Sequence, residues 1–226
     1  MSQPLAGCRQ ILRVLAPDWT STTGELQRFA HATAEGEWEP VGNAIPVSLG
    51  RGGLGWGIGL QPASDDGPRK AEGDGRAPAG VFAITALFGS ANADSDFARA
   101  ARLPYLAATP DLKAIDDPQS RHYDRIVDQR TVTKDWSSCE DMLRTDERYA
   151  VGAVIAHNAV PPQPGAGSCI FLHVWEKPGA PTAGCTAGAL AAIREICLWL
   201  EAAASPCLVQ LPQAEYARLR GCWQLP

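Results

Sequence analysis

Short segments that favour β-structure recur along this chain at spacings of about ten residues, with turn-forming residues between them. Residues 11–15 are apolar and partly β-branched, a polar turn occupies residues 18–24, and strand-like segments follow at residues 25–32 and 38–41. The same rhythm continues in segments 45–50, 79–84, 153–157, 169–175 and 207–211. Closely spaced strands of this kind are typical of a meander and not of βαβ units, which need a helix between strands. The sequence therefore predicts a mainly β fold.

Two regions interrupt this rhythm. Residues 186–203 are rich in Ala, Leu, Glu and Ile, and their apolar residues recur at helical spacing. We therefore expect one prominent helix there, ending before Pro206. Residues 89–150 are polar and rich in turn-forming residues, which predicts a loop-rich insertion. Short helices are expected inside it near residues 94–102 and 137–149.

Composition and charge limit the number of domains and the kinds of partner that we expect. Because 45% of the 226 residues are hydrophobic, we expect a single domain over residues 1–226, with its core in residues 9–212. The net charge is -5 and no basic patch is present, so nucleic acid is not expected as a partner. No apolar run approaches the roughly 18 residues of a transmembrane segment. The glycine-dense residues 52–59 lack a following helix, which predicts tight turns and close strand packing instead of a dinucleotide site.

The N-terminus and the cysteines bear on the compartment. Residues 1–13 lack the apolar core of a signal peptide, which leaves either a cytosolic protein or a mature chain in which Met1 replaces a leader. The seven cysteines form no CxxC pair, so a structural zinc site is not expected. Their odd number would leave one free thiol beside up to three disulfides in an exported enzyme. Buried apolar thiols are the alternative, and the spacing does not decide between them.

The segment 167–187 carries the strongest chemical signal. An apolar strand ends near His173, a short loop rich in Pro and Gly follows, and Gly184-Cys185 leads directly into the expected helix. A cysteine at a helix start lies in the positive end of the helix dipole, which lowers the pKa of its thiol. A nearby histidine can accept the thiol proton or pair with the thiolate. The residues therefore predict Cys185 as nucleophile and His173 as its base, with backbone N–H groups of residues 183–185 as an oxyanion hole.

In this arrangement the chain resembles the L,D-transpeptidase catalytic domain of the YkuD type. Gly184-Cys185 follows a histidine-bearing strand, as in that family's signature. Upstream, residues 77–82 resemble the family's Thr-Pro-x-Gly-x-Phe element, with Ala77 in the place of Thr. The two elements occur in the family's order, and the resemblance covers residues 70–84 and 150–190 well.

The resemblance implies a YkuD-like β-sandwich of mixed sheets, with the prominent helix after the nucleophile. It implies that Cys185 is acylated at the L,D bond next to diaminopimelate in a peptidoglycan stem peptide. His173 would activate the thiol, and the amine of a second stem peptide would resolve the thioester. The family needs no metal and no organic cofactor, and carbapenem-type β-lactams are expected to acylate the same cysteine. The implied location is the periplasm or cell envelope, with the leader absent from this chain.

The chain departs from the family pattern around the nucleophile. Cys185 follows His173 by only 12 positions, so the loop over the site is expected to be shorter than usual. Thr182 keeps the family's hydroxyl position, but Ala183 replaces a histidine and Ala187 stands where Asn or Arg is usual. We therefore expect other groups to hold the carboxylates of the substrate.

The expected substrate-binding residues are Thr182, Ala183, Trp175, His157, Arg125, Trp136 and Ser137. An arginine suits the carboxylates of a diaminopimelyl peptide, which favours Arg125. Trp136 is a candidate wall of the cleft, with Ser137 beside it. Structural roles are the alternatives: His157 would cap a loop, Arg125 would form surface ion pairs, and Trp136 would pack in the core with Ser137 as a helix cap.

Other functions remain open beside transpeptidation. Water would resolve the same acyl-enzyme in a carboxypeptidase or amidase. A second alternative is a non-catalytic wall-binding module with a decayed site. The retention of both His173 and Cys185 argues against it. A cytosolic thiol hydrolase of another fold is a further alternative, and a disulfide would count against it.

Overall fold

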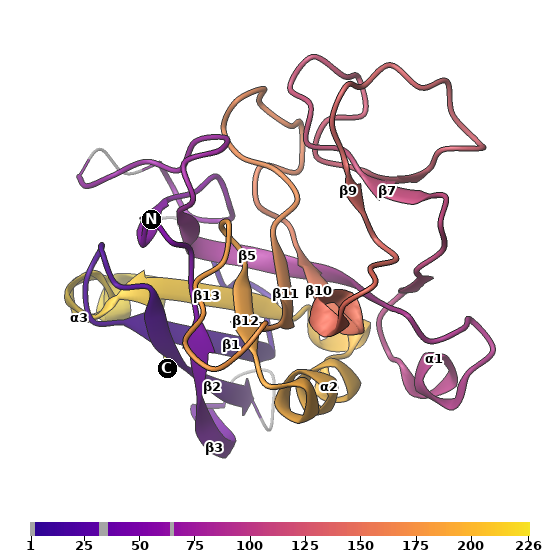
Figure 1. The fold of residues 1–226 in the computed structure, drawn as a ribbon. Helices are drawn as coiled ribbons and strands as arrows, with labels where there is room; N and C mark the ends of the chain where they lie inside the picture. Colours follow the sequence, from indigo (N-terminus) through magenta and orange to yellow (C-terminus); the bar gives the residue numbers. More distant parts are fainter. Residues whose placement is uncertain (1–2, 32–35, 64–65) are drawn as a thin grey trace.

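The computed structural model of the protein describes residues 3–31, 36–63 and 66–226 (Figure 1). Its strands are β1 Gln10–Ala16, β2 Thr23–His31, β3 Trp38–Ser48, β4 Leu54–Trp56, β5 Ala77–Gly89, β6 Tyr105–Ala107, β7 Leu112–Ala114, β8 Ile126–Asp128, β9 Glu140–Asp141, β10 Val151–Ile155, β11 Phe171–Val174, β12 Thr186–Gly188 and β13 Cys207–Pro212. Its helices are α1 Asp96–Ala100, α2 Leu190–Trp199 and α3 Gln213–Trp223, with 3-10 helices η1 Glu147–Tyr149 and η2 Ala202–Ala204. The expected mainly β fold is therefore confirmed.

Eight strands close into a barrel in the order β10-β11-β12-β3-β2-β1-β13-β5, and β5 pairs with β10 to complete the ring. Strand β5 makes this closure possible because it is 13 residues long. Residues 80–83 of β5 pair with β13, and residues 84–89 pair with β10, so one strand passes from one neighbour to the other. The expected β-sandwich of mixed sheets is therefore wrong, because the long β5 joins the two edges of the main sheet.

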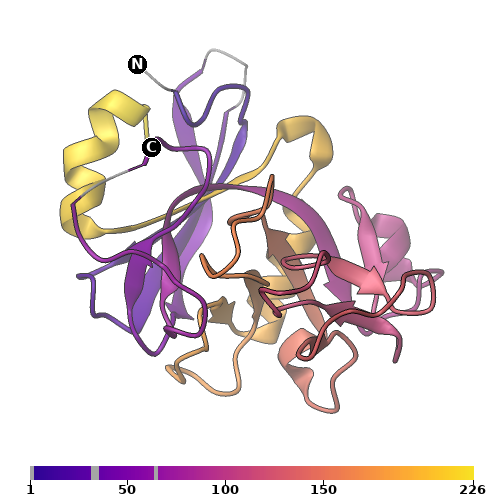
Figure 2. The ribbon, with the colours of Figure 1, turned by 90° about the horizontal axis from the view of Figure 1, so that it is seen from above.

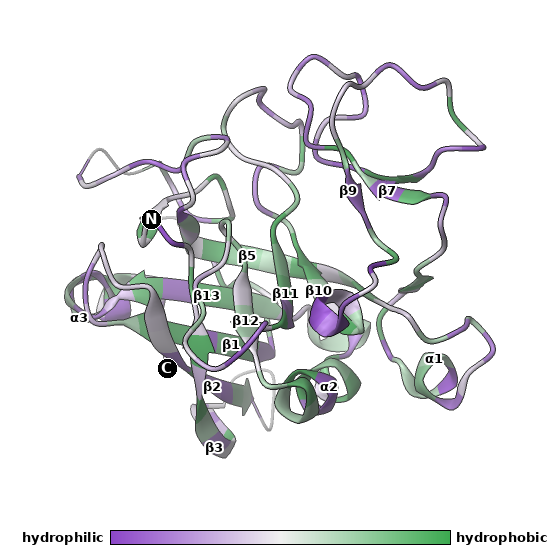
Figure 3. Ribbon diagram, viewed as in Figure 1, coloured by the Kyte–Doolittle hydropathy of each residue, from purple (hydrophilic) through white to green (hydrophobic). Residues whose placement is uncertain are grey.

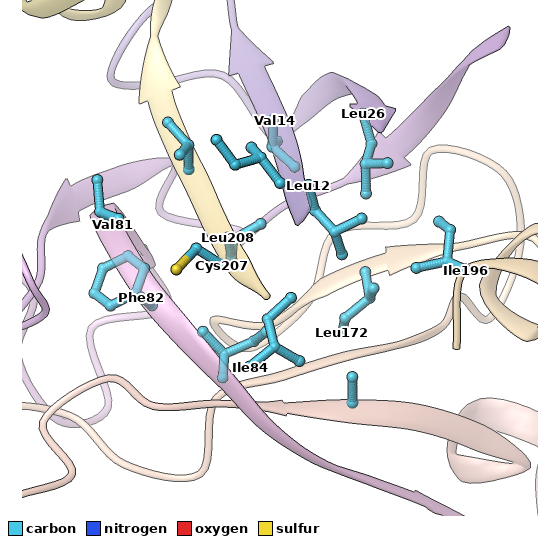
Figure 4. Close-up of a cluster of buried hydrophobic side chains, with 14 of the residues drawn as sticks. Leu12, Val14, Leu26, Val81, Phe82, Ile84, Leu172, Ile196, Cys207 and Leu208 are labelled. Atoms are coloured by element: carbon cyan, nitrogen blue, oxygen red, sulfur yellow. The ribbon is translucent and has the colours of Figure 1, made fainter. Parts of the chain in front are cut away.

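The barrel interior holds the main hydrophobic core (Figure 4). The inward side chains come from strands that are distant in sequence, and they include Leu12, Val14, Leu26, Phe82, Ile84, Leu172 and Leu208. Helix α2 packs on β10, β11 and β12 and adds Ile193 and Ile196 to this core. The barrel strands and α2 are largely hydrophobic, whereas many of the loops above them are hydrophilic (Figure 3).

The helices differ from the sequence-based expectation. Residues 186–188 pair with β11 as β12, so α2 begins at Leu190 and not directly after Cys185. The helix expected near residues 137–149 is wrong, because Glu140 and Asp141 pair with β7 and the helical part is limited to η1. The C-terminal helix α3 was not expected.

The insertion at residues 89–150 is loop-rich, as expected, and lies to one side of the barrel (Figures 1 and 2). The short helix expected near residues 94–102 is present as α1, and Ser95 caps it by accepting a hydrogen bond from the Ala98 N–H. Strands β8, β7 and β9 form a separate three-stranded sheet. A second cluster of buried side chains fills the space between this insertion and the barrel, and it includes Phe88, Met142, Tyr149, Phe171 and Cys185.

The glycine-dense turn before β4 packs closely against its neighbours, as expected. Gly53 has φ +75°, and a Cβ there would lie 2.2 Å from the Trp19 carbonyl oxygen. Between the glycines, the Arg51 N–H donates to the Thr182 carbonyl at 2.8 Å. This bond ties the turn to the loop that precedes Cys185.

Two further expectations concern the compartment. No helix in the described residues is long and apolar enough to cross a membrane. All seven cysteines lie within the described ranges and are free thiols, five of them buried. The structure therefore agrees with the alternative of unpaired, mostly buried cysteines.

Candidate active site

Cys185 and His173 are brought together by two parallel strands. Leu172 pairs with Thr186 and His173 with Ala187, so Cys185 lies level with Phe171 at the start of β12. Side chains alternate along a strand, which places Phe171, His173 and Cys185 on one face of the sheet while Leu172 enters the barrel core. The Phe171 N–H donates to Cys185 Sγ at 3.3 Å. The nucleophile candidate is thus held against the backbone of the histidine strand.

His173 lies against two backbone carbonyl groups, those of Val174 and Arg148. Its Nδ1 lies 2.8 Å from the Val174 carbonyl oxygen, and since a carbonyl accepts, we assign the proton to Nδ1. The other nitrogen, Nε2, is then a proton acceptor. The Tyr149 ring packs edge-on against the imidazole at a centroid distance of 5.3 Å. These contacts fix the orientation of the imidazole ring.

Both groups are neutral at neutral pH. Burial lowers the pKa of His173 to about 4, and the charges of Arg148 and Arg144 lower it further, whereas hydrogen bonds to the backbone carbonyls of Val174 and Arg148 oppose this. Burial raises the pKa of Cys185 to about 12, with a further rise from Glu140 and an opposing hydrogen bond from Phe171. The expectation of a thiol pKa lowered by a helix start is therefore wrong, because β12 separates Cys185 from α2. The thiol donates instead to the Cys169 carbonyl, with Sγ 3.6 Å from that oxygen.

The turn before the nucleophile is held by Thr182. The Gly184 N–H donates to Thr182 Oγ1 at 3.1 Å, and this hydroxyl donates to the Cys185 carbonyl at 2.6 Å. Gly184 has φ +154°, where a Cβ would lie 3.0 Å from the Arg76 carbonyl oxygen, so a glycine is favoured. Because its N–H is occupied, Gly184 is not an oxyanion donor, which leaves the N–H groups of Ala183 and Cys185 for that role.

A pocket of about 400 Å³ opens beside this pair. Five of the expected residues line it: Cys185, His173, Trp175, Thr182 and Ala183. The sequence analysis missed the remaining lining residues, which are Arg51, Glu140, Arg144, Arg148, Tyr149, Glu176, Ala180 and Pro181. Most of the charged ones come from the insertion and from the glycine turn, which are distant from Cys185 in sequence. No local pattern marks them, because the tertiary fold alone brings them to the pocket.

The other expected residues lie away from this pocket. Arg125 is exposed and lines a separate pocket with Asp124 and Cys169. Trp136 is buried against His122, and the N–H and hydroxyl of Ser137 both donate to Asp117 at 2.7 Å. The packing of Trp136 is that of its structural alternative, although no helix begins at Ser137. Among the residues that the structure describes, Arg125 forms no ion pair, so the structure does not bear out its alternative as a surface ion pair.

His157 is also placed structurally. Its Nδ1 accepts from the Ile58 N–H at 3.2 Å, and its Nε2 lies 3.0 Å from the Ala166 carbonyl oxygen. Both nitrogens are therefore used, and the ring joins the glycine turn to the loop before β11. Burial lowers its pKa to about 4.

We expect His157 to make the protein acid-labile. The unfolded chain binds this proton below its ordinary pKa of about 6.5, whereas the folded protein binds it near pH 4, so stability falls as the pH falls through this range. Asp124 acts in the opposite direction, since burial raises its pKa to about 7. The contribution of His157 is therefore isolated by comparing the stability of wild type with that of His157→Gln, because Asp124 is present in both. Denaturant unfolding should show their stability difference shrinking by up to about 3 kcal/mol between pH 7 and pH 4. A constant difference would contradict the prediction, and His122→Gln is the control.

We also expect slow alkylation of Cys185 in the free protein at neutral pH. A pKa of about 12, against an ordinary value of 9.0, lowers the thiolate population roughly a thousandfold. Iodoacetamide labelling read by peptide mass spectrometry should therefore be much slower at Cys185 in the folded than in the urea-unfolded protein, and should accelerate steadily up to pH 10. Rapid labelling at pH 7 without this rise would contradict the geometry.

Comparison of the chain with known protein families, with characterised proteins and with solved structures found no match. Within residues 3–31, 36–63 and 66–226, no group of three or more His, Cys, Asp or Glu side chains is arranged to hold a metal ion. The class that fold and site define is a β-barrel protein with a buried cysteine and histidine beside a charged pocket. Its function has to be inferred from the chemistry of that pocket.

Proposed function

We propose that this protein is a cysteine-dependent L,D-transpeptidase that acts on peptidoglycan stem peptides through a thioester on Cys185. The observation that carries the proposal is the shared opening of Cys185 and His173 into one pocket, with His173 Nδ1 tied to Val174. The order of a histidine strand, a short loop and Gly184-Cys185 supports the same class. On this proposal the barrel is a divergent form of the YkuD-type domain.

The chemistry requires one proton acceptor, and His173 supplies it. Nε2 takes the Cys185 proton as Sγ attacks the carbonyl carbon of the L,D bond, and the N–H groups of Cys185 and Ala183 receive the oxyanion. When the tetrahedral intermediate collapses, the C–N bond breaks and His173 returns the proton to the leaving amine. The amine of a second stem peptide then attacks the thioester, gives up a proton to His173 and releases the thiol. The reaction uses no external oxidant or cofactor.

The neutral resting pair supports this order of events. A thiol with a pKa near 12 is inert until a carbonyl is beside it, and a histidine with a pKa near 4 is free to accept a proton at neutral pH. The substrate lies outside the cytoplasmic membrane, so we place the protein in the periplasm or cell envelope. Carbapenem-type β-lactams, which present a reactive carbonyl, should acylate the same sulfur.

The test is incubation of wild type and Cys185→Ala with purified muropeptides, followed by mass spectrometry. Cross-linked dimers from wild type alone are expected, and their fragmentation locates the new bond. Cys222→Ala is the matched control, because Cys222 is exposed and outside the pocket. Shortened monomers without dimers would move the assignment to a carboxypeptidase or amidase. No product from wild type would overturn the catalytic proposal and favour a wall-binding module.

A further inference from the structure

The arginines that line the pocket differ in whether a carboxylate of the protein already binds them. Arg144 binds Asp146 through Nε at 3.0 Å and Nη2 at 2.9 Å. Arg148 binds the same carboxylate through Nε at 3.0 Å and Nη2 at 2.7 Å. One aspartate thus anchors both guanidinium groups, and the three side chains together leave a single positive charge.

Arg51 lies in the same pocket with its guanidinium unpaired within the described part of the chain. Its backbone is fixed by the N–H bond to Thr182, three residues before the nucleophile. Its side chain passes over Gly75, where a Cβ would lie 2.8 Å from Arg51 Cγ. The residue is exposed, so its planar fork of donors is open to a carboxylate that enters the pocket.

Glu140, which belongs to the insertion, contributes a carboxylate to the pocket. It accepts a hydrogen bond from the Tyr149 hydroxyl, and Tyr149 packs against His173. Burial raises the pKa of Glu140, and the nearby carboxylates of Asp116 and Glu72 raise it too. The cation that acts on it is Arg144, which is already bound to Asp146. A further ammonium group in the pocket would supply the charge that this buried carboxyl lacks.

We propose that this pocket binds a zwitterionic α-amino acid head group, with its carboxylate on Arg51 and its ammonium on Glu140. The inference rests on the proposed function, and it names the part of the substrate that would be recognised. In a stem peptide, the far end of a diamino-acid side chain carries both an ammonium and a carboxylate. With the near end of that residue bound to Cys185, the far end would extend along the pocket between the two charges. Arg51 and Glu140 would then determine which diamino acid is accepted.

The experiment compares the binding of three synthetic stem tetrapeptides by calorimetry. They differ in the side-chain end of the third residue: ammonium with carboxylate, ammonium with carboxamide, or ammonium alone as in lysine. Binding is measured to full-length Cys185→Ala, which cannot turn the peptides over, alone and combined with Arg51→Gln or Glu140→Gln. Glutamine keeps an acceptor for the Tyr149 hydroxyl, and Arg125→Gln is the control because Arg125 is exposed outside this pocket.

We expect the zwitterionic peptide to bind about 10- to 100-fold more tightly than the other two. Arg51→Gln should remove this preference and leave the other two affinities unchanged, whereas Glu140→Gln should weaken all three peptides. Equal affinities for the three peptides, or a preference that survives Arg51→Gln, would overturn the inference, and so would the absence of any binding. The proposed reaction is judged separately: a preserved preference without cross-linked or shortened product from wild type would leave the head-group site standing and remove the transpeptidase.

Discussion

His173→Gln is expected to lower the rate of Cys185 acylation at pH 7 by about 10²- to 10⁴-fold, the usual contribution of a positioned general base. The large effect follows from the pKa of Cys185, which burial raises to about 12, so almost no thiolate exists without a proton acceptor. The rate is measured by intact mass, as the appearance of the acyl-enzyme with a carbapenem or a stem peptide.

The pH dependence distinguishes this role from a structural one. Burial lowers the pKa of His173 to about 4, so the base is already unprotonated above that value. Wild-type acylation should therefore be nearly flat from pH 5 to pH 9. The variant depends on thiolate formed by hydroxide, and its rate should rise about tenfold per pH unit until it approaches pH 12. His122→Gln, in the insertion, should match wild type. A variant with an equally flat profile would show that His173 is not the base.

The parts of this site that were predicted from sequence are those with a local signature. Cys185 follows a glycine, and His173 lies in an apolar segment, so both were expected near one another, and the parallel pairing of β11 with β12 provides that proximity. The expectation that a helix dipole lowers the pKa of Cys185 was wrong, because residues 186–188 do not begin the helix. Their composition is compatible with a helix, but they pair with residues 172–174 as a strand. A three-residue strand is decided by its neighbours and not by its own sequence.

The closure of the barrel could not be predicted for a related reason. Residues 77–82 suggested a strand, but its extension to Gly89 and its division between β13 and β10 are matters of register. A sandwich and a barrel share the same alternation of apolar residues, and they differ in whether the last edges pair. The charged residues of the pocket could not be predicted for the same reason. Arg51 and Arg148 line the pocket with Cys185 only because of the tertiary fold, and no sequence motif marks them.

Phe88→Ala is expected to cost about 3–5 kcal/mol of stability, the usual range for truncating a buried phenylalanine. Phe88 is fully buried at the end of β5, where its ring packs edge-on against Phe171 at 5.1 Å and Tyr149 at 5.4 Å. Tyr149 in turn packs against His173, and the Phe171 N–H holds Cys185 Sγ. Removing this ring therefore opens a cavity beside the two aromatic rings that adjoin His173 and Cys185. Urea unfolding gives the stability, and intact mass gives the acylation rate of the folded protein.

Phe82→Ala separates stability from positioning. Phe82 is also fully buried in β5, but it packs in the barrel core and against His157, away from the pocket. The two variants should lose similar stability, whereas under conditions where both remain folded Phe88→Ala alone should acylate more slowly, by at least about tenfold. Equal rates would mean that the aromatic cluster supports the fold without placing Cys185 and His173. A selective loss would mean that the part of β5 that pairs with β10 both closes the barrel and sets the geometry of the site.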